Sequence, residues 1–433
     1  MSKVAFITLG CKVNQYETNA MSQEFIEKGY EVVEHHEKAD IYVINTCTVT
    51  NMSDRKSRQM LRRVKELNPN SIVIACGCYV QVAKDEVAKI EDIDLILGNN
   101  EKTNIVDHLE QYQKDKKRQL EIEDLMQQRE FVEFGDVTYT EKTRAVVKIQ
   151  DGCDRFCSYC IIPYARGRVR SRKPEGIISE ITKIAQEGIK EVVITGIHVA
   201  SYGKDFKENY GLIDLLEDLN KIEGIERIRL SSIEPLILDE QFINRLSKLE
   251  KICHNFHLSL QSGCDETLKR MNRRYNTEQF KTVVNLLRNT YKDAILTADV
   301  IVGFPGETEE EFEKTYKFLE DVKFYKTHVF KYSPRKGTKA AVMENQIDGN
   351  IKEQRSKKLI ELSNNFEKEY NESYIGKTVE VLWEEEKEGI YKGHTQNYLL
   401  AYYKPEKSDM NLENKITKAN CISAESDHVI VKI

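Results

Sequence analysis

Short apolar runs alternate with helical segments along the first hundred residues. The apolar runs lie at residues 3–9, 41–45, 71–75 and 93–97. Between them, residues 14–28 and 54–67 carry the spacing of helices. Strands that alternate with helices form a parallel sheet covered on both faces. We therefore predict an N-terminal α/β domain over residues 1–115, followed by a mostly charged linker over residues 116–143.

A second alternation of strands and helices begins near Arg144. Its apolar runs lie at residues 145–149, 191–195, 227–230, 255–260, 294–302 and 327–331. Six such units indicate a partial (βα)6 barrel, because a complete eightfold barrel takes ~250 residues. A long polar helix follows at residues 351–371. We predict the barrel domain over residues 144–371, with its chemistry at the carboxyl ends of the strands.

From Tyr374 onward the sequence pattern changes to short strands separated by turns. These strands are expected at residues 378–383, 398–403 and 428–433. They predict a small all-β barrel over residues 372–433. The fold class of the whole chain is therefore α/β, with an added β-barrel at its end.

The composition is that of an ordinary globular protein, with 433 residues, 40% hydrophobic and 31% charged. No apolar run approaches the ~18 residues of a membrane span, and the first residues lack the organisation of a signal peptide. We expect a cytoplasmic protein with no membrane partner. The net charge of −6 argues against indiscriminate nucleic-acid binding but permits a local basic groove.

Three cysteines, Cys153, Cys157 and Cys160, follow the first barrel strand with the spacing C-x3-C-x2-C. We call them the barrel cysteines. Three thiolates can hold one metal centre but leave its fourth position open. Zinc would need a fourth ligand, and no histidine or cysteine occurs in the twenty residues after Cys160. A zinc site and a purely structural iron–sulfur cluster remain as alternatives.

A second set of cysteines, Cys11, Cys47 and Cys78, is scattered through the N-terminal domain. We call them the N-terminal cysteines. Each follows a predicted parallel strand, and the carboxyl ends of such strands meet at one edge of the sheet. Gly10 and Gly77 would let the backbone turn tightly there. The alternative is that these are ordinary buried residues, the role that we expect for Cys76, Cys253, Cys264 and Cys421.

The barrel cysteine motif resembles that of the radical S-adenosylmethionine enzymes. The resemblance implies a [4Fe-4S] cluster whose open iron binds S-adenosylmethionine and cleaves it to a 5′-deoxyadenosyl radical. Tyr159 matches the family position near the adenine. Thr195 and Gly196 match a family segment that faces the methionine amino group. Further contacts to S-adenosylmethionine are expected from Ser259 and Gln261, near the end of the fourth barrel strand, and from Gly303 after the fifth, where glycine permits close backbone approach.

Further segments resemble the methylthiotransferases of this superfamily. They are Thr8-Leu-Gly-Cys-Lys-Val-Asn14, Asn45-Thr-Cys-Thr-Val49, Gly77-Cys-Tyr79 and Ile161-Ile-Pro-Tyr-Ala-Arg-Gly-Arg-Val-Arg-Ser-Arg172. The last 60 residues resemble the TRAM RNA-binding barrel of tRNA-modifying enzymes. The resemblance implies a second [4Fe-4S] cluster on the N-terminal cysteines, which carries the sulfur that a second S-adenosylmethionine methylates. It also implies an electron donor of the flavodoxin or ferredoxin type; the sulfur source stays open.

Three segments resemble the branch that modifies N6-threonylcarbamoyladenosine at position 37 of tRNA. They are Lys12-Val-Asn-Gln-Tyr-Glu17, Thr195-Gly-Ile-His-Val-Ala-Ser-Tyr-Gly203 and Leu230-Ser-Ser-Ile-Glu-Pro235. The expected reaction is 2-methylthiolation of this nucleoside. The alternatives are methylthiolation of isopentenyladenosine in tRNA or of a ribosomal-protein side chain, and a non-catalytic iron–sulfur RNA-binding protein.

Basic residues are dense after the barrel cysteines. Arginine forks suit phosphate, and we predict that RNA is bound by Arg166, Arg168, Arg170 and Arg172. Arg155, Lys173 and a second group, Lys269, Arg270, Arg273 and Arg274, extend this prediction. Either group could also be a solvated face. The C-terminal barrel holds eight lysines, no arginine and ten acidic residues from Tyr374 onward, so we expect it to contribute less to RNA binding.

Overall fold

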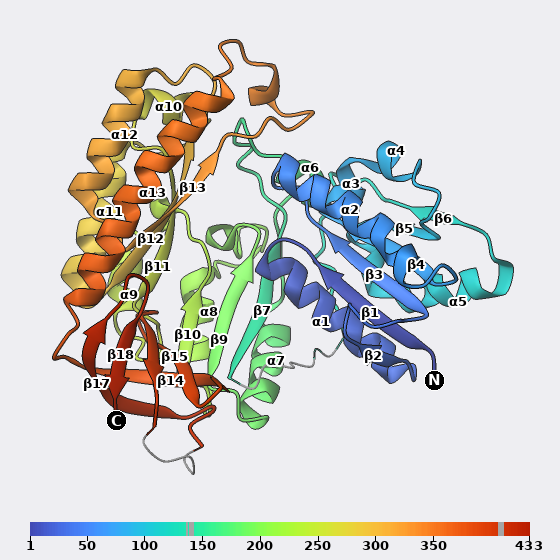
Figure 1. Cartoon of the computed structure of the whole chain (residues 1–433), viewed down its shortest axis with the longest axis horizontal. Helices are drawn as coiled ribbons and strands as arrows, with labels where there is room; N and C mark the ends of the chain where they lie inside the picture. Colours follow the sequence, from blue (N-terminus) through green and yellow to red (C-terminus); the bar gives the residue numbers. More distant parts are fainter. Residues whose placement is uncertain (136, 138–142, 406–410) are drawn as a thin grey trace.

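Six parallel strands form the N-terminal sheet of the computed structural model, which describes residues 1–135, 137, 143–405 and 411–433 (Figure 1). Their order is β2-β1-β3-β4-β5-β6. The strands are β1 (Lys3–Thr8), β2 (Glu31–Val33), β3 (Ile41–Thr46), β4 (Ile72–Gly77), β5 (Leu95–Leu97) and β6 (Gln119–Glu121). This arrangement confirms the predicted parallel α/β fold.

Helices cover both faces of this sheet. Helices α1 (Lys12–Glu27) and α5 (Ile105–Asp115) bury Tyr16, Phe25 and Leu109 against one face. On the other face, α2 (Asn51–Leu67) buries Leu61 and Val64, beside the short helices α3 (Cys78–Val82) and α4 (Lys84–Val87). Because α1, α2 and α3 each follow a strand, all three begin at the carboxyl edge of the sheet.

The segment predicted as a linker, residues 116–143, takes part in the structure. It supplies β6, which pairs with β5 in the N-terminal sheet. Farther along, Glu133 binds Arg172 of the barrel domain at 2.7 Å. The exact domain limits stay a prediction, but residues 119–121 belong to the first sheet.

The central domain contains the six predicted parallel strands. They are β7 (Arg144–Asp151), β9 (Glu191–Gly196), β10 (Arg227–Leu230), β11 (Asn255–Gln261), β12 (Ile295–Val302) and β13 (Lys326–Lys331). Isolated bridges from Ile228 to Ile252 and from Ile233 to Leu258 link the first three strands to the last three. The two-residue strand β8 (Arg170–Ser171) runs antiparallel beside β7. The strands thus form an incomplete barrel, as predicted.

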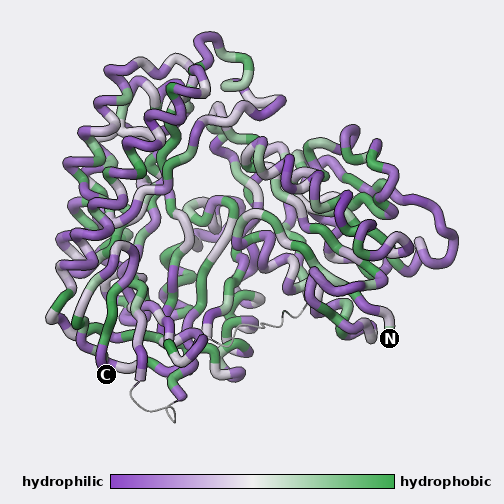
Figure 2. Tube along the Cα trace, in the orientation of Figure 1, coloured by the Kyte–Doolittle hydropathy of each residue, from purple (hydrophilic) through white to green (hydrophobic). Residues whose placement is uncertain are grey.

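Helices surround the outside of the barrel (Figure 1). They are α7 (Pro174–Gln186), α8 (Leu212–Asn220), α9 (Glu240–Leu246), α10 (Asp265–Arg270), α11 (Thr277–Thr290), α12 (Glu309–Val322) and α13 (Gly349–Glu372). The short helix α6 (Ile162–Arg166) lies instead in the loop after β7, against α3 of the N-terminal domain. Strands and inner helix faces are hydrophobic, while outer helix faces are hydrophilic (Figure 2). Among the residues that the structure describes, no helix is long and apolar enough to cross a membrane.

A closed five-stranded barrel ends the chain, as predicted. Its strands are β14 (Thr378–Lys387), β15 (Ile390–Thr395), β16 (Leu400–Tyr403), β17 (Ile416–Ala424) and β18 (Val429–Lys432), in the order β14-β15-β16-β18-β17. Trp383 fills its core and donates from Nε1 to Thr417 Oγ1 at 2.8 Å. Strands β14, β16 and β18 match the three predicted runs, whereas β15 and β17 lie in stretches where we predicted no strand.

Arginines at the amino ends of the central strands hold this small barrel. Arg144 binds Glu384 at 2.7 Å, Arg227 donates to the His394 carbonyl at 2.9 Å, and Arg229 donates to the Gln396 carbonyl at 3.1 Å. Because Arg144 and Arg227 begin β7 and β10, the small barrel lies at the end opposite to the barrel cysteines. It is therefore far from the edge where the chemistry is expected.

Candidate active site

The three N-terminal cysteines meet at the carboxyl edge of the first sheet. Cys11 is the N-cap of α1, Cys47 follows β3, and Cys78 begins α3. Cys11 is exposed, whereas Cys47 and Cys78 are buried. Burial raises the pKa of the Cys47 thiol to about 11, and the nearby Cys78 and Cys11 thiols act in the same direction. The structure thus gathers side chains that lie 67 positions apart in sequence.

Two glycines allow this convergence. Gly10 has φ +104°, and a side-chain carbon there would lie 2.8 Å from Cys47 Sγ. Gly77 has φ +99°, and a side-chain carbon there would lie 2.5 Å from the Thr46 carbonyl oxygen. Other residues rarely adopt such backbone angles and would also clash. Both positions therefore require glycine, as the sequence predicts.

Cys76 and Cys78 have different surroundings although they are two residues apart. Cys76 is completely buried in the hydrophobic core on the α1 face, where its Sγ lies 3.7 Å from the Ile44 carbonyl. Cys78 instead receives a hydrogen bond at 3.2 Å from Nε of Arg166 in the barrel domain. These positions favour Cys78 over Cys76 as a member of the ligand set.

The barrel cysteines lie on the loop that follows β7. The Arg155 backbone N–H donates to Cys153 Sγ at 3.5 Å, and Nη1 of Arg273 donates to Cys157 Sγ at 3.2 Å. Burial raises the pKa of Cys153 to about 11 and that of Cys160 to about 12. Binding of a metal centre to Cys153 and Cys160 must therefore release protons.

The donor chemistry of both cysteine sets fits an iron–sulfur cluster. Each set offers three thiols that can ligate iron as thiolates. Hydrogen bonds to the sulfur atoms, such as those from Arg166 to Cys78 and from Arg273 to Cys157, are also a feature of iron–sulfur sites.

Arg166 joins the two domains beside the N-terminal cysteines. Its guanidinium is fully buried and binds Asn14 at 2.6 Å, Glu17 of α1 and Asp151 at the end of β7, in addition to Cys78. Arg170 and Arg172 are also buried, the first against the Arg166 carbonyl and the second against Glu180. All three guanidinium groups form hydrogen bonds or ion pairs within the protein.

This burial contradicts our prediction that Arg166, Arg170 and Arg172 bind RNA phosphates, because none of them reaches the surface. Only Arg168 keeps an exposed side chain, which lies over the Phe156 ring and 3.3 Å from Asp154. In the second basic group, Arg270 binds Glu311 and Arg273 donates a hydrogen bond to Cys157. Lys269 and Arg274 are exposed. An RNA contact by Arg168 stays a prediction.

The buried network around Glu17 carries more positive than negative charge. Its members in the described chain are the cations Lys102, Lys148, Arg166 and Arg170 and the carboxylates Glu17 and Asp151. Burial alone would raise the pKa of Glu17, but Arg166, Lys102 and Lys148 hold it well below its usual range. Buried charges need a counter-charge. An anionic cluster on the N-terminal cysteines would balance the surplus that faces Cys78.

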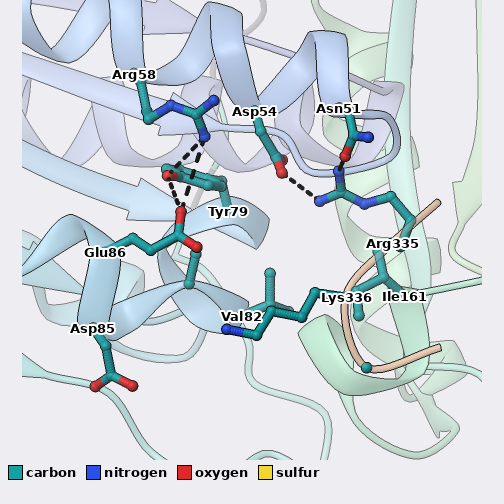
Figure 3. A pocket seen from close by; sticks show the side chains of 12 residues that line it. Asn51, Asp54, Arg58, Tyr79, Val82, Asp85, Glu86, Ile161, Arg335 and Lys336 are labelled. Carbon is teal, nitrogen blue, oxygen red and sulfur yellow. Dashed lines mark hydrogen bonds and ion pairs between the residues drawn. The ribbon is translucent and has the colours of Figure 1, made fainter. Parts of the chain in front are cut away.

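Two cavities adjoin the cysteine sets. The larger, about 650 Å³, lies between the N-terminal domain and the loop after β13, with side chains from α2 and α4 pointing toward it (Figure 3). The smaller, about 240 Å³, is lined by Tyr159, Cys160 and Gln261 together with Val49 and Thr50, which follow Cys47. Ile161 lines both cavities. The cavities therefore lie where the loops of both cysteine sets approach each other.

The predicted S-adenosylmethionine residues divide into two groups. Tyr159 and Gln261 line the smaller cavity, whereas the other four are not among the described residues around it. Thr195 is buried, the Ser259 hydroxyl lies 3.0 Å from that of Ser232, and Gly196 packs on Gln150. A side-chain carbon on Gly303 would lie 2.2 Å from Lys352 of α13. Their contact with the cofactor stays a prediction.

Sequence reasoning missed two residues whose partners are distant in sequence, Glu234 within the barrel domain and Arg335 between the two domains. Glu234 binds Arg155 of the barrel cysteine loop and lies 3.3 Å from His198. Burial would raise its pKa, but the hydrogen bond and charge of His198, with the charges of Arg155 and Arg273, lower it to about 2. Arg335, after β13, binds Asp54 at 2.5 Å and Thr48 at 2.6 Å, immediately beyond Cys47 (Figure 3).

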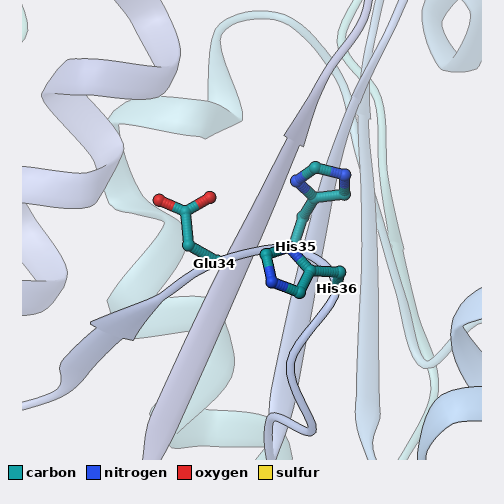
Figure 4. Close-up of side chains that lie close together, drawn as sticks. All are labelled: Glu34, His35 and His36. Carbon is teal, nitrogen blue, oxygen red and sulfur yellow. The ribbon is translucent and has the colours of Figure 1, made fainter. Parts of the chain in front are cut away.

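One further group of potential metal ligands lies apart from the cysteines. Glu34, His35 and His36 are consecutive, and one ligand atom from each lies within 4.8 Å of the others (Figure 4). All three are exposed at the end of the edge strand β2. Exposed groups of this kind are common on protein surfaces, so we assign them no role.

Comparison with known proteins agrees with this geometry. The profile of the "Radical SAM superfamily" matches residues 147–319, and that of the "Uncharacterized protein family UPF0004" matches residues 3–98. The chain is 42% identical to threonylcarbamoyladenosine tRNA methylthiotransferase MtaB of Bacillus subtilis over 430 residues, which is 98% of this chain and 94% of the relative. The chain belongs to the radical S-adenosylmethionine methylthiotransferase family.

Other members of this family are also similar. The methylthiotransferase is 35% identical to tRNA-2-methylthio-N(6)-dimethylallyladenosine synthase of Clostridium botulinum over 433 residues, with 98% of this chain and 96% of the relative covered. It is therefore an enzyme of a class that uses S-adenosylmethionine and [4Fe-4S] clusters. This confirms the resemblance that its motifs indicate.

Solved structures show the same fold at low identity. The radical S-adenosylmethionine methyltransferase TsrM from Kitasatospora setae, with cobalamin and a [4Fe-4S] cluster bound, has a TM-score of 0.56 at 15% identity. The match covers 79% of the methylthiotransferase chain and 77% of TsrM. The cobalamin-dependent enzyme OxsB has a TM-score of 0.52 at 14% identity, over 85% of this chain and 56% of its own. These likenesses concern the fold alone.

Proposed function

We propose that this methylthiotransferase converts N6-threonylcarbamoyladenosine at position 37 of tRNA to its 2-methylthio derivative. The Bacillus subtilis relative that is named for this nucleoside is 42% identical, and the relatives named for dimethylallyladenosine are 35% identical. The observation that carries the proposal is that Cys160 and residues that directly follow Cys47 and Cys78 (Val49, Thr50 and Tyr79) line one pair of adjoining cavities. Two reactive centres can thus act on one substrate atom.

Replacement of an aromatic C–H bond by C–S–CH3 needs chemistry that acid and base groups do not provide. When bound, the [4Fe-4S] clusters and S-adenosylmethionine supply a radical that removes the hydrogen, a sulfur atom and a methyl group. The protein supplies binding and orientation. Cys153, Cys157 and Cys160 would hold one cluster, and Cys11, Cys47 and Cys78 the other.

Neighbouring side chains would position these groups. Tyr159 and Gln261 would hold S-adenosylmethionine in the smaller cavity, beside Cys160. Arg335 would keep the loop after Cys47 against the barrel through Thr48 and Asp54. The larger cavity, which is open to solvent and lined by Arg58, Tyr79 and Lys336 among others, would admit the nucleoside of the tRNA. Ile161 would lie between the cofactor and the nucleoside.

The remaining partners follow from this chemistry. A reduced flavodoxin or ferredoxin would supply electrons, and the reaction on tRNA would take place in the cytoplasm. The exposed Arg168 lies on the barrel cysteine loop and would be available to an RNA phosphate. The C-terminal barrel is net acidic and lies at the opposite end of the central strands, so the main RNA contacts would lie elsewhere.

Nucleoside analysis tests the proposal. tRNA that carries N6-threonylcarbamoyladenosine is incubated with reconstituted enzyme, S-adenosylmethionine and dithionite, then digested and analysed by mass spectrometry. We expect the 2-methylthio derivative to appear. A parallel reaction uses tRNA that carries N6-dimethylallyladenosine. Product only in that second reaction would assign the enzyme to the other branch, and product in neither would reject both tRNA nucleosides as substrates.

A further inference from the structure

Helix α2 carries a continuous basic face on the outside of the N-terminal domain. Successive residues of a helix are rotated by about 100°, and this rotation places Arg55, Lys56, Arg62 and Arg63 on one side. Burial divides the helix in the same way, because all four are exposed while Ser57, Leu61 and Val64 face the sheet. Of the other residues on the outer side, only Glu66 is acidic, at the far end of the helix.

These four side chains differ from the other basic residues near the site. Arg166, Arg172 and Arg335 each bind one or more carboxylates. In contrast, no described carboxylate lies within 4.0 Å of the charged groups of Arg55, Lys56, Arg62 or Arg63. The protein as a whole has a net charge of −6. A row of unpaired cations on an acidic protein is a localised site for an anionic partner.

The basic face starts at the active site. Helix α2 follows β3 and Cys47, and the Thr50 side chain caps it by accepting a hydrogen bond from the Ser53 backbone N–H. Arg335 fixes its first turn through Asp54, and both residues line the larger cavity, as does Arg58 (Figure 3). From Asn51 to Arg62 the helix rises about 16 Å. The cations therefore extend outward from the cavity mouth.

Apolar side chains accompany the cations at this end. Met52 is 69% exposed on the outer face of α2, and Val49, which lines the smaller cavity, is 52% exposed. Phe330 is 45% exposed and lines the same cavity. Of the three, Phe330 is aromatic, and aromatic side chains beside cations are typical of surfaces on which unstacked bases stack.

We propose that the outer face of α2, with Arg55, Lys56, Arg62 and Arg63, binds the phosphates of the tRNA and leads the target nucleoside into the larger cavity. This inference rests on the proposed function. It assigns RNA binding to the α2 face instead of to the buried arginines Arg166, Arg170 and Arg172. A protein electron donor is also anionic in many cases, but it would serve the barrel cysteines, whereas this face begins beside Cys47. RNA therefore fits the position better.

The test is a pair of charge variants of the full-length, reconstituted enzyme. The first combines Arg55→Gln, Lys56→Gln, Arg62→Gln and Arg63→Gln. The matched control combines Lys28→Gln, Lys38→Gln, Lys114→Gln and Lys117→Gln, four exposed lysines of the same domain at the ends of elements on the opposite edge of the sheet. Circular dichroism and iron content show that both variants are folded. A second variant pair, Arg55→Gln with Lys56→Gln and Arg62→Gln with Arg63→Gln, covers the case that the fourfold change does not fold.

Binding of unmodified and threonylcarbamoylated tRNA is measured between 50 and 200 mM salt. We expect the α2 variant to bind tRNA at least about tenfold more weakly. The negative slope of the logarithm of the association constant against the logarithm of the salt concentration should become shallower by about 3, as for the loss of four phosphate contacts. The control should bind as the wild type does. Unchanged affinity and slope in the α2 variant would overturn the inference. If tRNA binding is unchanged and only the reduction of the enzyme by a protein electron donor is impaired, the inference is overturned as well. If the wild type itself neither binds nor modifies tRNA, the proposed function fails instead.

Discussion

Arg166 donates a hydrogen bond from Nε to Cys78 Sγ at 3.2 Å, and this contact joins the barrel domain to the N-terminal cysteines. The same guanidinium binds Glu17 of α1 and Asn14. One side chain thus fixes the position of Cys78, the cluster ligand that we propose, relative to the barrel. The buried surplus of positive charge around it also gives the site an electrostatic character that suits an anionic cluster.

Replacement of Arg166 by Gln should lower the midpoint potential of the cluster on the N-terminal cysteines. Removal of a nearby positive charge destabilises the reduced, more negative form, on the order of 100 mV, or about 2.3 kcal/mol for one electron, at a charge separation of ~7 Å and an effective dielectric constant of ~20. Arg166→Lys keeps the charge and should stay near the wild-type potential. A redox titration followed by electron paramagnetic resonance measures both variants. Equal potentials in the wild type and Arg166→Gln would show that this charge does not act on the cluster.

Glu17→Gln should destabilise the protein strongly. The carboxylate is buried and binds Lys102 at 2.6 Å and Lys148 at 2.7 Å, as well as Arg166. Loss of one partner from a buried ion network costs about 3–5 kcal/mol, because the remaining charges lose their counter-charge. Thermal and urea unfolding measure the effect. The control Glu310→Gln, at a surface pair with Lys314, should leave the transition unchanged, and a similarly small effect at Glu17 would refute the network's importance.

Glu234 should make the barrel domain sensitive to acid. Its pKa is lowered to about 2 from an ordinary value of 4.5, so its carboxylate contributes stability that is complete above pH 4.5. This contribution is lost as the pH falls from 4.5 toward 2, by about 1.4 kcal/mol per pH unit. Urea unfolding of the metal-free wild type and of Glu234→Gln at pH 7, 4 and 3 checks this. The two proteins should converge in stability as the pH falls, and a constant difference would contradict the prediction.

Arg335→Ala should uncouple cofactor cleavage from product formation. Its guanidinium holds Thr48 and Asp54 beside Cys47, and among the described residues its hydrogen bonds go to the N-terminal domain rather than to a barrel cysteine. We expect 5′-deoxyadenosine to form at a near wild-type rate while the methylthio nucleoside falls about tenfold or more, since misplacement of a reactive centre by about 1 Å can lower a rate 10²-fold. Both products are measured in one reaction. Arg245→Ala, which breaks a similar arginine pair with Asp214 and Glu217, is the control. An equal loss of both products would contradict the prediction that Arg335 acts on the loop after Cys47 alone.

Patterns within one segment were predictable from the sequence. The alternation of strands and helices gave the order of the three domains, and the position of Cys11, Cys47 and Cys78 after parallel strands placed them on one edge. Gly10 and Gly77 were predictable for the same reason, because tight turns at strand ends need a positive φ. These features depend on local spacing and on rules of sheet topology.

Pairing between distant residues was not predictable from one sequence. The run from Arg166 to Arg172 has the appearance of an exposed basic loop, but its partners Glu17, Asp151 and Glu180 come from three other elements. The sequence does not show that these carboxylates surround the loop. The helix at residues 54–67 was predictable, but its exposed cations gained meaning only when the fold placed the start of α2 at the larger cavity.

The most direct test of the account compares the wild type with a variant in which Cys11, Cys47 and Cys78 are all replaced by alanine. Iron content, 5′-deoxyadenosine and the methylthio nucleoside are measured after reconstitution and reaction with threonylcarbamoylated tRNA. The wild type should bind about eight irons, as expected for two four-iron centres, and form both products. The variant should bind about four irons and form 5′-deoxyadenosine without the methylthio nucleoside. A wild type that saturates at about four irons, with no change in the variant, would contradict the two-cluster account.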